Sequence, residues 1–324
     1  IVKPIVKKTF LLDDKEKVLD TMHEAIFESL SGRPGPVWID IPLDYQWDEA
    51  QVESEHIKKI ALNNKPLANE DTYNKFYKLM NEATKPLFVL GYGVRLSDSV
   101  DLCKKLIEKY SFDFVTTWTG ADYFPTDHKN NLGIIGMRGQ EGANKAIFDS
   151  DLVICLGTHL SIPHTTTLTE TYAPNSKKII VNIDKDQLGE LNIEFDLKIH
   201  EDLKTFLKKI STGQSYKKYK SFSHLKPLNW YEPYEQIKPN PNNFFRQLTK
   251  ESDNSTAFII DGGGTALYAG FQSAFIKEGQ RIICSSSISA MGTGLAETIG
   301  VHNAKNFSDL ICIIGDGSFL MNIQ

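Results

Sequence analysis

The residues best suited to chemistry lie near the end of the chain, where an apolar run delivers a carboxylate between two glycines. Residues 311–314 predict an apolar strand, and Gly315-Asp316-Gly317-Ser318 follows directly. Ligands of an α/β sheet bind at the carboxyl ends of its strands, and free backbone N–H groups at a helix start favour a phosphate. A carboxylate beside a phosphate needs a cation between them, and Mg²⁺ prefers oxygen ligands. The segment therefore indicates either a magnesium–phosphate site or a strand–turn–helix in which Asp316 caps the helix.

Two further glycine-rich turns precede this one, DGGGT at residues 261–265 and SAMGTG at residues 289–294. Consecutive glycines leave main-chain N–H groups free to bind an anion, and Thr265 can cap a helix or donate to a phosphate. Met291 can pack against a ligand ring or fill a core. All three turns fall at predicted strand ends within residues 261–316, so together they predict one shared site.

The elements that must position these turns alternate between helices and short apolar strands, a pattern typical of parallel, doubly wound sheets in an α/β fold. We expect an initial unit over residues 1–46, with a helix near 18–30 and a strand at 37–42. A linker at 47–68 leads to a complete central unit at 69–210, and a second linker at 211–241 leads to a last unit at 242–324. In the central unit the expected helices are 71–83, 97–110, 141–150 and 201–210, and the strands are 85–93, 112–120, 151–157 and 177–184.

Composition excludes several partners. The formal net charge of −5 and pI of about 5.9 give no support for nucleic acid or a membrane. The first ten residues alternate like a strand rather than a signal peptide, and no apolar run reaches the ~18–20 residues of a membrane span. Cys103, Cys155, Cys284 and Cys312 are widely spaced, which favours buried free thiols in a reducing cytoplasm.

The order DGGGT, SAMGTG, apolar strand and GDGS resembles the cofactor-binding domain of thiamine-diphosphate enzymes, and is most similar to their acetolactate synthase branch. SGRPGPVWIDIP at residues 31–42 resembles the end of that family's pyrimidine-binding domain. KPLFVLGYGVR and the segments at residues 134–158 and 177–184 resemble its central domain. The resemblance implies a complete central domain between partial pyrimidine-binding and diphosphate-binding domains. It covers nearly the whole chain apart from the linkers.

The resemblance implies thiamine diphosphate and Mg²⁺ as cofactors, with Asp316 as the metal ligand and Met291 beneath the cofactor rings. The backbone of Ser289 would contact the aminopyrimidine. The residues placed along the diphosphate are Gly264, Thr265, Gly315, Gly317 and Ser318.

The implied activity is decarboxylation of a 2-oxo acid, pyruvate above all, with carboligation to a second carbonyl. Such enzymes are dimers or tetramers whose active sites lie between subunits. The glutamate that activates the cofactor belongs upstream of Ile1, so no catalytic residue is assigned here. The chain opens without a methionine and stops at Gln324 where a helix is starting, so we expect a fragment that is inactive alone.

Flavin is left open by one departure from the family. Where acetolactate synthases carry an arginine- and aspartate-rich segment that contacts FAD, this chain has His159 and His164, which we expect at the surface. The departure favours a relative with another acceptor. Two other classes stay open: a nucleotide-binding α/β protein, although no GxGxxG has the right context, and a non-catalytic relative that kept the fold.

Overall fold

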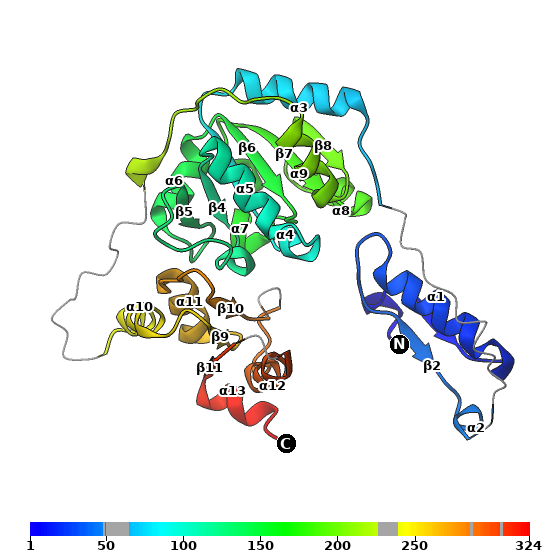
Figure 1. Ribbon diagram of the computed structural model, residues 1–324. Helices are drawn as coiled ribbons and strands as arrows, with labels where there is room; N and C mark the ends of the chain where they lie inside the picture. The colour runs from blue at the N-terminus through cyan, green and yellow to red at the C-terminus, as the bar shows by residue number, and fades with distance from the viewer. Residues whose placement is uncertain (48, 50–64, 226–238, 286–287, 305–306) are drawn as a thin grey trace.

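The computed structural model describes residues 1–47, 49, 65–225, 239–285, 288–304 and 307–324, which form three α/β units (Figure 1). The largest unit contains a six-stranded parallel sheet of order β5-β4-β3-β6-β7-β8. Its strands are β3 (Pro86–Leu90), β4 (Phe114–Thr116), β5 (Asn131–Ile134), β6 (Leu152–Leu156), β7 (Lys177–Asn182) and β8 (Leu197–His200). Its helices are α3 (Glu70–Glu82), α4 (Gly93–Leu96), α5 (Val100–Tyr110), α6 (Glu141–Asp149), α7 (Ile162–Thr165), α8 (Lys185–Glu190) and α9 (Leu203–Thr212).

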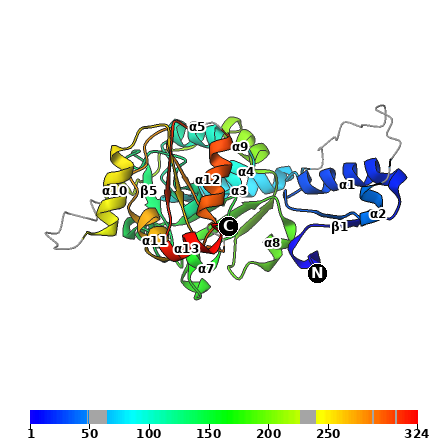
Figure 2. The same ribbon diagram turned by 90° about the horizontal axis from the view of Figure 1, so that it is seen from below.

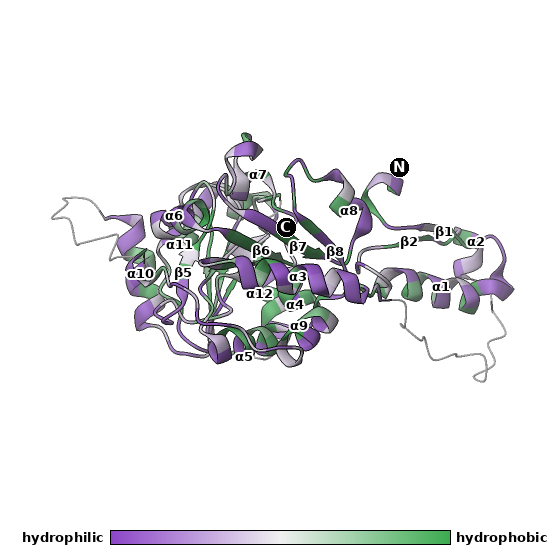
Figure 3. Ribbon diagram, turned by 90° about the horizontal axis from the view of Figure 1, so that it is seen from above, coloured by the Kyte–Doolittle hydropathy of each residue, from purple (hydrophilic) through white to green (hydrophobic). Residues whose placement is uncertain are grey.

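Helices cover both faces of this sheet because side chains alternate along each strand. Phe88 and Leu90 of β3 join one buried cluster with α3, α5 and α9. Leu87 and Val89 of the same strand join a second cluster with α6 and α8. In Figure 3 the central strands are largely green, whereas α3 and α5 carry both colours. The prediction of a doubly wound parallel sheet is confirmed.

The last unit is a three-stranded parallel sheet of order β10-β9-β11. Its strands are β9 (Thr256–Ile260), β10 (Arg281–Ile283) and β11 (Asp309–Ile313), and its helices are α10 (Pro241–Glu251), α11 (Gly264–Ser273), α12 (Gly294–Ala304) and α13 (Asp316–Met321). Trp118 and Ile134 of the central unit share a buried cluster with Phe271 and Ile282 of this unit. The two units are therefore packed against each other.

The first unit pairs β1 (Thr9–Leu11) in parallel with β2 (Trp38–Asp40) through α1 (Val18–Leu30), and α2 (Leu43–Gln46) follows. Figures 1 and 2 both place it beside α8 of the central unit, where Arg33 Nη1 lies 3.2 Å from Asp184 Oδ2. Only part of the expected first strand forms, because Lys3–Ile5 adopts a 3₁₀ turn that has proline in its first positions.

The first predicted linker lies largely outside the described residues, which omit 48 and 50–64, and the second lies partly outside them, at 226–238. In the described part of the second linker, α9 continues to Thr212, and Phe222 is fully buried against the central sheet. Those residues therefore pack on the central unit. Among the described helices, none combines the length and the apolar character needed to span a membrane.

Candidate cofactor site

The three glycine-rich turns meet at one edge of the last sheet. Strands β10, β9 and β11 are parallel neighbours, so their carboxyl ends point the same way. The turn at residues 261–264 follows β9, the loop that carries Met291 follows β10, and the turn that carries Asp316 follows β11. The structure thus brings together turns that are separated by up to 55 positions in the sequence.

Asp261 joins the first two turns. Its side chain is buried, and its carboxylate accepts hydrogen bonds from the backbone N–H groups of Gly294, at 2.8 Å, and Gly292, at 3.3 Å. These bonds satisfy the buried charge, which would otherwise be costly. This structural role of Asp261 was not predicted from the sequence, because it depends on a contact across some thirty residues.

Close backbone approach explains two of the glycines. A Cβ on Gly262 would lie 2.3 Å from the carbonyl oxygen of Ala290. A Cβ on Gly292 would lie 2.7 Å from Asn322 Nδ2, which itself donates to the Gly292 carbonyl at 3.1 Å. The turn that carries Met291 is therefore held between the other two turns.

The residues assigned to the diphosphate lie at helix starts. Gly264 and Thr265 open α11 and are exposed, and no side chain of a described residue caps that helix. Gly264 has φ of +62°, and no heavy atom in the described part of the chain lies within 4 Å of the position where a Cβ would stand. Its surroundings leave room for a group that approaches the backbone closely. Ser318, in the first turn of α13, is buried.

Asp316 is not a helix cap. Gly315 is the N-cap of α13, and Asp316 is its first residue. The Asp316 carboxylate is exposed and accepts only from the adjacent Gly317 N–H, at 2.8 Å, among the described residues. Its remaining lone pairs are open to a cation. No group of three or more His, Cys, Asp or Glu side chains in the described part of the chain could hold a metal, so Asp316 would supply one ligand of several.

Met291 is not a core residue either, since its side chain is 46% exposed. Its Cγ lies 3.4 Å from the position of a Cβ on Gly263. The preceding Ser289 adopts a left-handed φ of +53°, which is uncommon outside glycine. The methionine thus stands over the first turn with one side open.

The two histidines differ in environment. His159 is exposed, as predicted, whereas His164 is only half-exposed and its Nε2 is buried. His164 packs against the ring of Trp118, and its Nδ1 lies 3.0 Å from Ser161 Oγ. Burial lowers the pKa of His164 to about 4, so the ring is neutral at physiological pH.

A cavity lies at the switch point of the central sheet, where the strand order reverses between β3 and β6. This cavity of about 430 Å³ is bounded by the loops after β3, β6 and β7 and by residues 31–34 of the first unit. Gly93 and Gly157 touch there, because a Cβ on either would lie 2.6 Å from the other's Cα. Open α/β sheets bind ligands at such points.

Comparisons with known proteins agree with this geometry. Residues 73–210 match the family described as thiamine pyrophosphate enzyme, central domain. Residues 262–324 match thiamine pyrophosphate enzyme, C-terminal TPP binding domain. The chain belongs to the thiamine pyrophosphate enzymes, and the second match contains all three glycine-rich turns apart from Asp261.

The chain is also similar throughout to acetolactate synthases. It is 30% identical to the acetolactate synthase of Arthrospira platensis, over 100% of this chain and 58% of that protein. It is 30% identical to a probable acetolactate synthase large subunit of Methanocaldococcus jannaschii, over 99% of this chain and 57% of that protein. It is 28% identical to the chloroplastic acetolactate synthase 2 of Nicotiana tabacum, over 100% of this chain and 50% of that protein. The chain thus spans between half and three fifths of these relatives' lengths.

Proposed function

We propose that the protein carrying this chain decarboxylates a 2-oxo acid and joins the retained carbons to a second carbonyl, with thiamine diphosphate and Mg²⁺. The observation that carries the proposal is the convergence of three glycine-rich turns around an exposed carboxylate, Asp316, and an exposed methionine, Met291. The family membership supports the thiamine diphosphate, and the names of the relatives support the acetolactate synthase type of reaction.

The residues at this edge fit the cofactor. Free N–H groups at the start of α11, next to Gly264 and Thr265, suit a diphosphate. Asp316 and the turn glycines would place Mg²⁺ against the same diphosphate, and Ser318 lies buried two residues further on. Met291, with the backbone of Ser289, would hold the cofactor rings. When bound, thiamine diphosphate supplies the carbon nucleophile on which 2-oxo acids lose CO₂.

The remaining features of the proposal concern the whole protein. We propose pyruvate as the donor, because the relatives are acetolactate synthases. We also propose a homodimer or homotetramer in the cytoplasm, with the activating glutamate outside residues 1–324. On this account the chain alone binds cofactor poorly and does not turn over.

A nucleotide is a second candidate ligand, for the cavity at the switch point. Its volume and the close glycine contact between Gly93 and Gly157 favour such a ligand. FAD would be one choice, although the loop after β6 carries neither arginine nor aspartate at residues 157–166. Titration of ADP and of FAD into the wild type and into Gly93→Ala tests this second candidate. Binding to the wild type that is lost in Gly93→Ala supports a nucleotide site, and no binding to the wild type excludes one.

The test of the proposed reaction is CO₂ release from pyruvate by the protein that carries this chain, with added thiamine diphosphate and Mg²⁺. We expect release that depends on both additions and is lost in Asp316→Ala. Asp309→Ala removes an exposed carboxylate at the opposite end of β11 and serves as the matched control. A folded protein that binds the cofactor but releases no CO₂ from pyruvate or other 2-oxo acids would remove the enzymatic part of the proposal.

A further inference from the structure

A cavity of about 270 Å³ lies between the central unit and the last unit. Its walls come from residues 117–119 after β4, residues 157–164 after β6, and residues 281–285 in and after β10. The β10 segment leads directly to the loop that carries Met291. An occupant of this cavity would therefore touch both units at once, next to the cofactor edge without being part of it.

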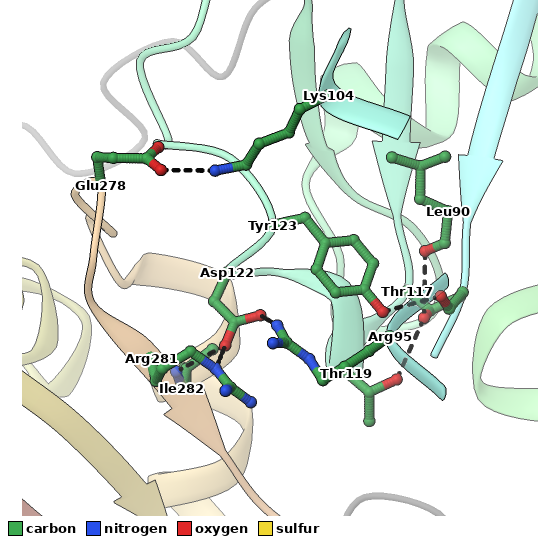
Figure 4. A network of polar contacts seen from close by, with 11 residues as sticks. Leu90, Arg95, Lys104, Thr117, Thr119, Asp122, Tyr123, Glu278, Arg281 and Ile282 are labelled. Carbon is green, nitrogen blue, oxygen red and sulfur yellow. Dashed lines mark hydrogen bonds and ion pairs between the residues drawn. The ribbon is translucent and has the colours of Figure 1, made fainter. Parts of the chain in front are cut away.

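The cavity has a positive wall. Arg281 is the one lining residue with a full charge among those the structure describes, and no carboxylate there lines the cavity. Behind it, the buried Asp122 accepts from Arg281 Nε at 2.5 Å and from Arg95 Nη2 at 2.6 Å (Figure 4). One carboxylate between two guanidinium groups leaves a net positive charge at this site.

Arg281 has hydrogen-bond donors that Asp122 does not engage. Asp122 engages only its Nε, and the backbone N–H of Ile282 donates to the same Asp122 oxygen at 3.2 Å. The two terminal nitrogens of Arg281 make no hydrogen bond within the described part of the chain, and Figure 4 shows them pointing away from Asp122. A guanidinium end of this kind matches a carboxylate in a two-pronged geometry.

Further donors in the same region lack partners. Trp118 Nε1, His164 Nε2 and Arg95 Nε are buried without a hydrogen bond to any described residue. Trp118 and His164 line the cavity, and when Ser161 Oγ donates to His164 Nδ1 the ring proton sits on Nε2. Buried polar groups in native proteins are almost always paired. These nitrogens have almost no accessible surface, so they give the cavity a polar wall without facing its interior.

The loop after β6 is also strained. Leu160 has φ of +49° and Thr166 has φ of +67°, and these residues flank the segment that carries Ser161 and His164. Left-handed conformations cost free energy in non-glycine residues and persist where the surroundings impose them, often at ligand sites. The strain therefore supports a binding role for this wall.

We propose that this interdomain cavity binds a small organic carboxylate, with the anion on the terminal nitrogens of Arg281 and the carbon skeleton against Trp118 and Phe271. The apolar rings suit a short hydrocarbon part, and the hydroxyl groups of Thr117, Thr119 and Ser161 suit the oxygens. Because the ligand contacts both units, its binding stabilises their interface. The proposal is independent of thiamine diphosphate, and its test contains none.

The test uses propionate and its uncharged isostere propionamide, titrated into the full chain. The readout is the NMR signal of the Trp118 indole N–H, which Trp118→Phe assigns among the four tryptophans. We expect propionate to shift this signal and propionamide at the same concentrations to leave it in place. Arg281→Gln should weaken propionate binding by at least about tenfold, whereas Arg281→Lys should retain part of the affinity.

The matched control is Lys104→Gln, which breaks the Lys104–Glu278 ion pair (2.6 Å) at the same domain interface but outside the cavity. It should bind propionate as the wild type does. If Arg281→Gln fails to fold, Trp118→Phe takes its place. Propionate should then raise the melting temperature of Trp118→Phe by less than it raises that of the wild type. Equal binding of propionamide, or unchanged binding in folded Arg281→Gln, contradicts the proposal. Displacement of propionate by FAD, together with FAD binding to Arg281→Gln, also contradicts the proposal, because these results assign the cavity to a flavin.

Discussion

Two aspartates show how environment separates structural from chemical roles at the scale of single residues. Asp261 is buried and its two oxygens are fixed by backbone N–H groups of the neighbouring turn. Asp316 is exposed and engages only its neighbour Gly317 among the described residues. A satisfied buried carboxylate holds a fold together, whereas an exposed one beside free N–H groups is available for a metal.

His164 gives a prediction at this scale. Its folded pKa of about 4 lies below the ordinary value of 6.5 because burial disfavours the charged ring. The unfolded chain therefore binds the proton more readily. The stability that the neutral ring contributes is complete above about pH 6.5 and is lost as the pH falls towards 4.

We expect the free energy of unfolding of the wild type to drop by about 3 kcal/mol at most over this range, and His164→Asn to lose that part of the drop. Denaturant titrations at several pH values measure it. His224→Asn, at an exposed ring, should keep the wild-type pH dependence. Identical pH profiles for His164→Asn and the wild type would show that burial of this ring has no energetic consequence.

At the scale of elements, the parallel neighbours β3 and β6 end in loops that touch each other through Gly93 and Gly157. Gly157 follows β6 with φ of +60°, and a Cβ there would lie 2.6 Å from the Cα of Gly93. Both the conformation and the contact exclude a side chain. Gly157 lines both the cavity at the switch point and the cavity between the central and last units.

Gly157→Ala should therefore lower the free energy of unfolding by about 2 kcal/mol or more. Gly189 lies within α8 with no heavy atom near its Cβ position, so Gly189→Ala should raise it by about 0.5–1 kcal/mol. Chemical denaturation of the two variants gives effects of opposite sign on this account. Equal effects would mean that the contact between the two loops tolerates a side chain.

Most elements of the two larger units could be predicted because each carries a local signal. Strands such as β6 are uninterrupted apolar runs, and α9 has four buried residues at helical spacing, with Asp202 capping its start. The first strand was only partly predicted, since alternation at residues 1–10 carries no information on the proline-led 3₁₀ turn. Local patterns predict elements where burial and propensity agree.

At the scale of the whole molecule, the interface between the central and last units combines an apolar cluster with a buried charge. Trp118 stacks on Phe271 with ring centroids 5.8 Å apart. Beside them Asp122 joins Arg281 to Arg95 across the interface. The ring contact excludes water and so strengthens the ionic one.

Asp122→Asn should destabilise the protein by about 3 kcal/mol or more, because it leaves two arginines at a largely buried site without their carboxylate. The loss should separate the unfolding of the two units into distinct calorimetric transitions. Glu278→Gln, which removes the exposed ion pair to Lys104 at the same interface, should cost no more than about 1 kcal/mol. A single transition at the wild-type temperature in Asp122→Asn would contradict this account of the interface.

The glycine-rich turns of the candidate site could be predicted from the sequence, but the contacts between distant residues around it could not. Glycines and small polar residues at strand ends identified Gly264, Met291 and Asp316 from the sequence, because each turn carries its own local signal. Asp122 and Arg281 are 159 residues apart and lie in otherwise ordinary segments. No local pattern connects them, and the burial of His164 depends on the packing of Trp118.

The central claim is that the three turns form one site for thiamine diphosphate and Mg²⁺. Its most direct test is calorimetric titration of thiamine diphosphate, with and without Mg²⁺, into the protein that carries this chain and into its Asp316→Ala and Asp309→Ala variants. We predict Mg²⁺-dependent binding that Asp309→Ala preserves and Asp316→Ala weakens by at least about tenfold, with all three proteins equally stable because both carboxylates are exposed. Binding that is equally strong in Asp316→Ala, or absent from the folded wild type, would contradict the claim.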